Sequence, residues 1–311
     1  MMTDLPHCPV PGEIMTIAAA ERSLAAEALS LILEPFQPLR EQLIAITGLG
    51  LEQDSDAVDP SLRRLQVVSP VSGGPVSLLA AGQPDGQRVI FIHGSPGLGE
   101  EWMAFLADVP EGLLYLAPDR PGFGNSGDTP VTDLQDQADS LHPLLGPSTQ
   151  PPVVVVGYSY GGPVALRLAA DRPDRVAGVL LVGAAADPAL EEVHPLQEVA
   201  ALAFFEQFLP SELASSNAEL LDLRGGLEML ADDLGNLSVP VTIIQGSDDT
   251  LVPAMNVDYL RAKLPVSPAT VMLESADHFL PWTHTDLLAQ ALACLLANAA
   301  DYVSGEDGPL K

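Results

Sequence analysis

Short apolar runs alternate with longer amphipathic segments over most of this chain. Eight runs, each bounded by glycine, proline or polar residues, are predicted as strands: "RRLQVVSP", "PVSLLAAG", "RVIFIHG", "GLLYLAPDRPG", "PPVVVVGYS", "VAGVLLVGAAA", "VPVTIIQGSDD" and "ATVMLESADH". The segments predicted as helices between and after the last six runs are 99–108, 132–145, 162–172, 219–234, 254–264 and 286–300. Apolar strands that alternate with helices predict an α/β fold with a mostly parallel central sheet covered by helices on both faces.

Two segments depart from this alternation. In residues 14–50 the apolar positions recur at helical spacing, and an acidic stretch follows, so residues 1–60 are predicted to form a helical extension and a linker. Residues 61–305 then form the main domain, and residues 306–311 a short tail. The segment of about residues 186–218, which follows the sixth predicted strand, is too long to be a simple crossover connection. We expect them to form a short helical lid over the carboxyl edge of the sheet, where open α/β sheets bind ligands.

The charge balance narrows the possible partners. The chain has 42 acidic and 13 basic residues and a formal net charge of −29 at pH 7. Such a surface repels nucleic acid and anionic lipid. No stretch reaches about 18 uncharged apolar residues, so no membrane span is predicted. The N-terminus lacks the basic and continuous apolar regions of a secretory signal, which favours the cytoplasm. The sequence does not determine the oligomeric state.

The chain has two cysteines, which lie near its opposite ends. Cys8 is in a proline-rich segment, and Cys294 is in an apolar run with helical spacing. We therefore expect no structural disulfide, and no cluster of residues suggests a metal site.

The segment "VVVVGYSYGGPVALRLAA", residues 153–170, changes abruptly from a strand pattern to a helix pattern around Ser159. A serine hydroxyl that acts as a nucleophile must project from the backbone toward a base. A sharp turn from strand to helix would project it, but it would also crowd the residues two positions away. Glycine at 157 and 161 would remove that crowding. The pattern predicts a nucleophile elbow with Ser159 at its apex.

A serine nucleophile needs a base and an acid that orients the base. Of the six histidines, His278 follows the last predicted strand in a loop expected at the carboxyl edge of the sheet. The acid should follow the strand "VPVTIIQGSDD", where Asp249 is favoured over Asp248. Asp187, after the sixth predicted strand, is a third candidate.

The charge that develops on a carbonyl oxygen during acyl transfer needs hydrogen-bond donors. One is the backbone N–H of Tyr160, which directly follows the nucleophile at the start of a helix. The loop "FIHGSPG" offers a second, and by position we predict the N–H of Ser95. His93 is interpreted as a side chain that braces this loop and transfers no proton.

Five motifs occur in a familiar order: "HGSPG", "DRPGFGNS", "GYSYGG", "GSDDTLVP" and "DHF". With them the chain resembles the α/β-hydrolase superfamily from about residue 65 to 300, in its esterase and lipase-like branch. The resemblance implies a serine hydrolase with the triad Ser159, Asp249 and His278 in the family's order, and requires no metal or cofactor. A serine nucleophile speaks against the family's dehalogenase and epoxide hydrolase branches. The helical extension lies outside the resemblance.

The substrate is expected to be a neutral, partly apolar carboxylic ester that is hydrolysed through an acyl-enzyme. Between residues 176 and 260 Arg224 is the only lysine or arginine, so a substrate carboxylate would find little to pair with. Phe204, Phe205 and Phe208 in the predicted lid should supply apolar surface to the acyl group. An aminopeptidase of the proline iminopeptidase type, a C–C bond hydrolase, a cofactor-free perhydrolase and a catalytically silent binding module remain alternatives.

Overall fold

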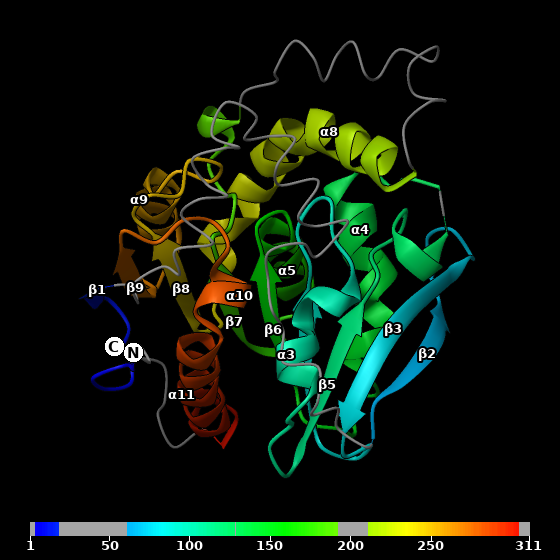
Figure 1. Ribbon diagram of the computed structural model, residues 1–311, viewed down its shortest axis with the longest axis horizontal. Coiled ribbons are helices and arrows are strands. Elements are labelled where there is room, and N and C mark those ends of the chain that lie inside the picture. The colour runs from blue at the N-terminus through cyan, green and yellow to red at the C-terminus, as the bar shows by residue number, and fades with distance from the viewer. Residues whose placement is uncertain (1–3, 19–60, 128, 192–210, 305–311) are drawn as a thin grey trace.

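The computed structural model describes residues 4–18, 61–127, 129–191 and 211–304 (Figure 1). Its sheet has nine strands in the order β1-β9-β8-β7-β6-β4-β5-β3-β2. Strand β3 pairs antiparallel with β2 and β5, and every other strand pair is parallel. The strands are β1 Ile14–Ala18, β2 Arg63–Val68, β3 Pro75–Gly82, β4 Gln87–Ile92, β5 Leu113–Pro118, β6 Val153–Tyr158, β7 Val176–Val182, β8 Val241–Gly246 and β9 Ala269–Glu274. The predicted α/β class and the eight predicted strands are thus confirmed.

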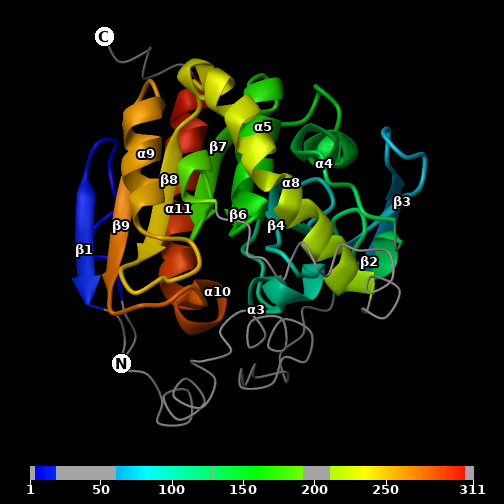
Figure 2. The same ribbon diagram turned by 90° about the horizontal axis from the view of Figure 1, so that it is seen from above.

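Helices cover both faces of the sheet (Figure 2). They are α3 Met103–Leu106, α4 Leu134–Leu141, α5 Gly161–Asp171, α8 Ser211–Asp233, α9 Met255–Lys263, α10 Leu280–Thr283 and α11 Thr285–Ser304. Short 3-10 helices are η2 Gly99–Trp102, η3 Gly124–Ser126, η4 His142–Leu145, η5 Pro188–Leu190 and η6 Leu234–Asn236. One buried core packs α4, α5, α8 and α9 against one face, and a second packs α3, α10 and α11 against the other.

The four consecutive valines of β6 are explained by these two cores. Val153 and Val155 belong to the core that contains α5, whereas Val154 and Val156 belong to the core that contains α11. Successive side chains of a strand point to opposite faces, so a strand covered on both sides must be apolar at every position. All residues of β6 are buried.

The order of the strands positions the candidate site. Strand β4 lies between β5 and β6 in the sheet. The next strand along the chain, β5, therefore lies on one side of β4, and the strand after it, β6, lies on the other side. In parallel sheets the ligand binds outside the carboxyl ends of the strands at such a switch point. Ser159 directly follows β6 at this point.

The beginning of the chain differs from the sequence prediction. Helix was expected from residue 14, but Ile14–Ala18 forms strand β1, which pairs parallel with β9 in a register that sets Ile14 opposite Thr270. The helix prediction is therefore wrong over these five residues. The remainder of that prediction, residues 19–60, lies outside the described residues.

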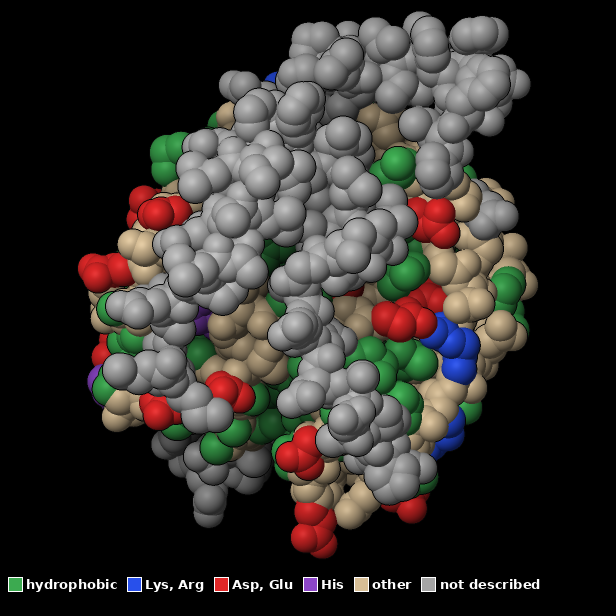
Figure 3. All heavy atoms as spheres, viewed as in Figure 1, with side chains coloured by type: hydrophobic (Ala, Val, Ile, Leu, Met, Phe, Trp, Pro, Cys, Tyr) green, Lys and Arg blue, Asp and Glu red, His purple; other side chains and the backbone are tan. Residues whose placement is uncertain are grey.

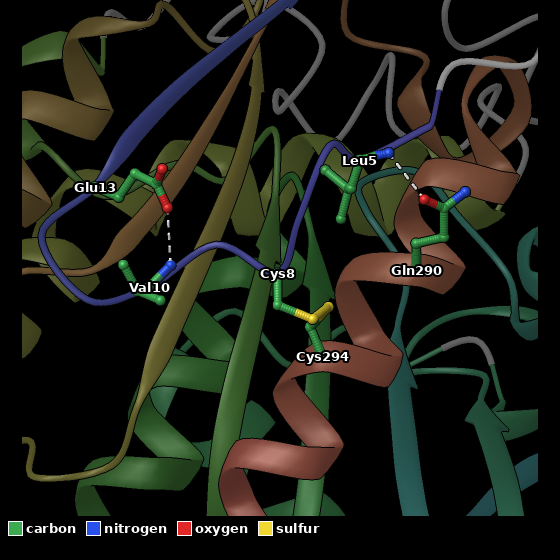
Figure 4. The surroundings of a disulfide bond; sticks show 6 residues. All are labelled: Leu5, Cys8, Val10, Glu13, Gln290 and Cys294. Carbon is green, nitrogen blue, oxygen red and sulfur yellow. Dashed lines mark hydrogen bonds between the residues drawn. A yellow bond between two sulfur atoms is a disulfide. The ribbon is translucent and has the colours of Figure 1, made fainter.

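The expectation that the two cysteines stay unpaired is also wrong. Cys8 forms a disulfide with Cys294 of α11, with the two Cα atoms 5.5 Å apart (Figure 4). The backbone N–H of Leu5 donates a hydrogen bond of 2.8 Å to Oε1 of Gln290, one helical turn away on α11 (Figure 4). The cysteines are 286 positions apart, and β1 pairing beside β9 is what brings the first of them near α11.

The predicted lid is described only at its two ends. Residues 186–191 contain η5, and residues 211–218 form the first two turns of α8. Phe204, Phe205 and Phe208 lie outside the described residues, so their role stays a prediction. In the described part of the chain, no helix has both the length and the apolar character needed to cross a membrane. Acidic side chains are dispersed over the face shown in Figure 3, where basic ones are few.

Candidate active site

Ser159 occupies the turn between β6 and α5 in a backbone conformation that is rare for a residue with a side chain. Its φ angle is 52°, in the left-handed region. Its N–H donates to the carbonyl of Val182 at the end of β7 (3.0 Å), and its own carbonyl accepts from the N–H of Gly162 (3.0 Å). These bonds hold the strained turn in place. Such strain is a feature of functional sites when the surrounding structure enforces it.

Both flanking glycines are needed sterically. A Cβ atom on Gly157 would lie 2.8 Å from the carbonyl carbon of Gly161 and closer still to its oxygen. A Cβ atom on Gly161 would lie 2.7 Å from the carbonyl oxygen of His93 and closer still to that of Ile92. Backbone atoms cannot move away as a flexible side chain can. The crowding expected from the sequence is thus present at both positions.

Asp249 and His278 form a buried pair beside this turn. Nδ1 of His278 lies 2.7 Å from Oδ2 of Asp249, and both residues are buried. Oδ1 of Asp249 accepts from the N–H groups of Leu251 (3.0 Å) and Val252 (2.8 Å), and Oδ2 also accepts from Nε2 of Gln245 (3.1 Å). Hydrogen bonds of this kind stabilise the charged carboxylate and fix its orientation.

The two competing aspartates have other surroundings. Asp248 is exposed, and its Oδ1 accepts a hydrogen bond from the hydroxyl of the neighbouring Ser247 (2.9 Å). Asp187 caps η5 by accepting from the N–H of Ala189 (2.9 Å). Of the three candidate acids, Asp249 is therefore the one that contacts His278.

His278 lies at the same edge of the sheet as Ser159. Its ring is 4.9 Å, centroid to centroid, from the ring of Tyr158, the residue before the serine. A Cβ atom on Gly183 would lie 3.2 Å from Nδ1 of His278, and Gly183 follows the Val182 carbonyl that binds Ser159. The ends of β6, β7 and β8 and the loop after β9 thus meet around the serine.

The loop after β4 passes close to Ser159. A Cβ atom on Gly94 would lie 3.1 Å from that of Ser159, so a larger residue would push the loop and the serine apart. His93 is fully buried beneath the loop. Its Nε2 accepts from the backbone N–H of Arg120 (2.9 Å), which leaves the proton on Nδ1 to bind the carbonyl of Gly94 (2.8 Å). Burial, together with the charge of Arg120, holds the pKa of His93 well below its usual value. His93 braces the loop as a neutral ring, as expected.

The loop after β4 is also supported by two residues for which the sequence predicted no role. Arg120, in the motif "DRPGFGNS", is fully buried, and its guanidinium forms a two-point ion pair with Glu219 of α8, with both N–O distances 2.7 Å. Burial acts to lower the pKa of Arg120, but the Glu219 carboxylate outweighs it, and the net direction is upward. The guanidinium also donates to the carbonyls of His93 (3.2 Å) and Gly94 (2.7 Å). No local pattern pairs Arg120 with a residue 99 positions away, so the sequence carried no signal for this contact.

Glu101 supports the same loop through its N–H groups. Its Oε1 accepts from the N–H of Leu98 (3.2 Å), and its carboxyl group also takes a backbone hydrogen bond from Gly94. Burial raises the pKa of Glu101 to about 8, so this carboxyl holds a proton more readily than an exposed glutamate does.

A possible cation site in the described residues lies far from this edge in the fold. Asp139, His142 and Asp171 could present ligand atoms to one ion. Nε2 of Gln135 already donates to both aspartates, and Arg167 pairs with Asp171. These contacts account for the cluster without a metal.

Comparisons with known proteins agree with this fold. A profile of the alpha/beta hydrolase family matches residues 89–292. The chain belongs to the alpha/beta hydrolase family. It is 40% identical over 103 residues to the lipase LipV of Mycobacterium tuberculosis, an alignment that covers 33% of this chain and 38% of LipV.

Two further relatives cover more of the chain. A pimeloyl-[acyl-carrier protein] methyl ester esterase of Aromatoleum aromaticum is 30% identical over 229 residues, which are 57% of this chain and 85% of that protein. The structure of a thermophilic esterase from Thermogutta terrifontis is similar in fold, with a TM-score of 0.61 and 22% identity over 76% of this chain and 99% of that one. Esterase and lipase relatives within the family mark this alpha/beta hydrolase as a hydrolase enzyme.

Proposed function

We propose that this protein hydrolyses neutral, partly apolar carboxylic esters through an acyl-enzyme formed on Ser159. The observation that carries the proposal is the buried pair of His278 and Asp249 at the edge where the strained Ser159 turn emerges. A nucleophile, a base and a group that orients the base are the minimal set for acyl transfer by serine.

Each group has a task in the proposed reaction. With its Nδ1 proton bound to Asp249, His278 presents Nε2 as the acceptor for the hydroxyl proton of Ser159. The serine oxygen attacks the ester carbonyl, and the N–H groups of Tyr160 and Ser95 bind the oxyanion. His278 then gives its proton to the leaving alcohol. Water, activated by the same histidine, attacks the acyl-enzyme and releases the acid, which restores Ser159.

The surroundings of the site favour an uncharged substrate. Arg120, the cation that contacts the loop beside Ser159, is fully buried and bound to Glu219. It is therefore not free to pair with a substrate carboxylate. Esterases among the relatives are consistent with an ester substrate. Phe204, Phe205 and Phe208 remain our prediction for the residues that contact the acyl group.

The disulfide bears on where the protein works. The sequence favoured the cytoplasm, but structural disulfides persist mainly in oxidising compartments. Cys8–Cys294 supports an oxidising environment instead. Thiol labelling of the protein from freshly lysed cells tests this, because a reduced pair would favour the cytoplasm.

The proposal is tested with p-nitrophenyl esters of graded acyl length, assayed beside an aminoacyl anilide. We expect turnover of the esters, and a loss of at least about a thousandfold in Ser159→Ala and in His278→Ala, because the members of a triad act as a unit. The folded state of each variant is checked by its melting temperature. Preference for the anilide would favour an aminopeptidase. Retention of near-full activity in either variant would refute the assignment, and a wild-type protein inactive on every substrate would favour a binding module.

A further inference from the structure

The guanidinium of Arg120 binds the carbonyl oxygen of the peptide group that joins Gly94 to Ser95. Nη2 of Arg120 donates to the carbonyl oxygen of Gly94 at 2.7 Å, and Nε donates to the carbonyl of His93 at 3.2 Å. The carbonyl of Gly94 and the N–H of Ser95 belong to one planar trans peptide, so they point in opposite directions. An arginine that fixes the carbonyl therefore also fixes the direction of the Ser95 N–H. A charged donor on the carbonyl polarises the peptide and makes that N–H a stronger donor.

Arg120 is itself held by helix α8. Glu219 binds the guanidinium at two points, and Nε2 of Gln137 donates to the same carboxylate at 3.2 Å. One turn earlier on α8, the hydroxyl of Ser216 accepts from the hydroxyl of Ser95 at 2.9 Å. Helix α8 thus reaches the loop both through Arg120 and directly. The two-point geometry leaves the guanidinium little freedom to rotate.

From these contacts we propose that Arg120, fixed by Glu219, is a positioning residue that aims the backbone N–H of Ser95 at the oxyanion. The inference rests on the proposed function, in which that N–H is an oxyanion donor. Neither charged side chain touches the substrate. Their effect appears when the carbonyl oxygen becomes negative, because a donor that is slightly misdirected binds the neutral ester almost as well but the oxyanion less well.

The test replaces Glu219 by glutamine, which keeps the shape of the side chain and removes its charge. Removal of a whole oxyanion donor lowers kcat by about 100-fold to 1,000-fold, so we expect misdirection to lower it by about tenfold or more. KM should change by less than about twofold. A trifluoromethyl ketone with the acyl chain of the best ester probes the oxyanion directly, since Ser159 adds to it to form a tetrahedral alkoxide. Its inhibition constant should rise by the same factor as kcat falls.

Asp222→Asn is the matched control, because it removes one carboxylate from the exposed side of the same helix. It should leave kcat and ketone affinity unchanged. A folded Glu219→Gln variant with wild-type kcat, or one in which kcat falls and ketone affinity does not, overturns the inference. If Glu219→Gln is unfolded at the assay temperature, Glu219→Asp is judged by the same two criteria. Ser159→Ala separates a failure of the proposed function from a failure of the positioning role. If Ser159→Ala is inactive while Glu219→Gln is fully active, only the positioning role is refuted.

Discussion

The elbow makes a steric demand that one methyl group can test. In Gly161→Ala the new Cβ would lie 2.7 Å from the carbonyl oxygen of His93 and closer to that of Ile92, whereas ordinary contact begins at 3.4 Å. To restore ordinary contact with the oxygen of His93, the turn would have to move away from the end of β4 by at least 0.7 Å, which is 3.4 Å minus 2.7 Å. Strands β4 and β6 are hydrogen-bonded there, with Ile92 opposite Gly157, so such a movement disrupts their pairing.

We expect Gly161→Ala to lower the free energy of unfolding by about 3 kcal/mol or more, the upper part of the range for overpacking, because backbone atoms cannot relax as side chains do. The melting temperature should fall by about 6 °C or more. Esterase activity should fall as well, since the same movement displaces Ser159.

Gly225→Ala is the control for this experiment. Gly225 lies on the exposed side of α8, and apart from the backbone of its own helix and its chain neighbours, no atom of the described residues lies within 4 Å of a Cβ placed there. Alanine should therefore stabilise the protein there by about 0.5–1 kcal/mol through helix propensity. Thermal and urea unfolding of both variants give the two free energies. A Gly161→Ala variant as stable and as active as Gly225→Ala would show that the elbow is not constrained as described.

Three further predictions concern charge and covalent structure. Asp249→Asn should reduce kcat/KM by about 1,000-fold or more and Asp248→Asn by less than about threefold, measured with the best ester, and the reverse order would move the orienting role to Asp248. The pKa of Glu101 in the folded protein, about 8, exceeds its ordinary value of 4.5, so the stability that this group contributes should be fully present below about pH 4.5 and be lost as the pH rises through 8. Glu101→Gln should flatten that decline, as measured by urea unfolding at a series of pH values. An equally steep decline in the variant would exclude Glu101 as its source. Reduction of Cys8–Cys294 should lower the free energy of unfolding by about 2–5 kcal/mol, whereas Cys8→Ser should be insensitive to reductant.

The sequence predicted those parts of the fold that depend on neighbouring residues. The valines before Ser159 and the glycines on each side of it form one local unit, so strand, turn and helix could be read together. His278 and Asp249 followed from the rule that the ends of parallel strands meet at one edge. The structure brings this pair together, while their catalytic roles stay a prediction.

The sequence failed where structure depends on distant partners. Residues Ile14–Ala18 are too few for helix and strand periods to be told apart, and their pairing with β9 decides the outcome. The disulfide depends on that same pairing. Arg120 and Glu219 are 99 positions apart and meet only after α8 has packed on the sheet. Both carry a charge, yet both are buried.

Covalent labelling is the most direct test that Ser159 is an activated nucleophile. A fluorophosphonate reacts with a serine only when a base activates it and an oxyanion site receives the phosphonyl oxygen. The protein is incubated with one equivalent, its residual esterase activity is measured, and the modified peptide is located by mass spectrometry. We expect one adduct per chain, on Ser159, formed in proportion to the loss of activity and absent in His278→Ala. Full inactivation with the adduct on another residue, or ester hydrolysis that persists after Ser159 is fully labelled, would contradict this expectation.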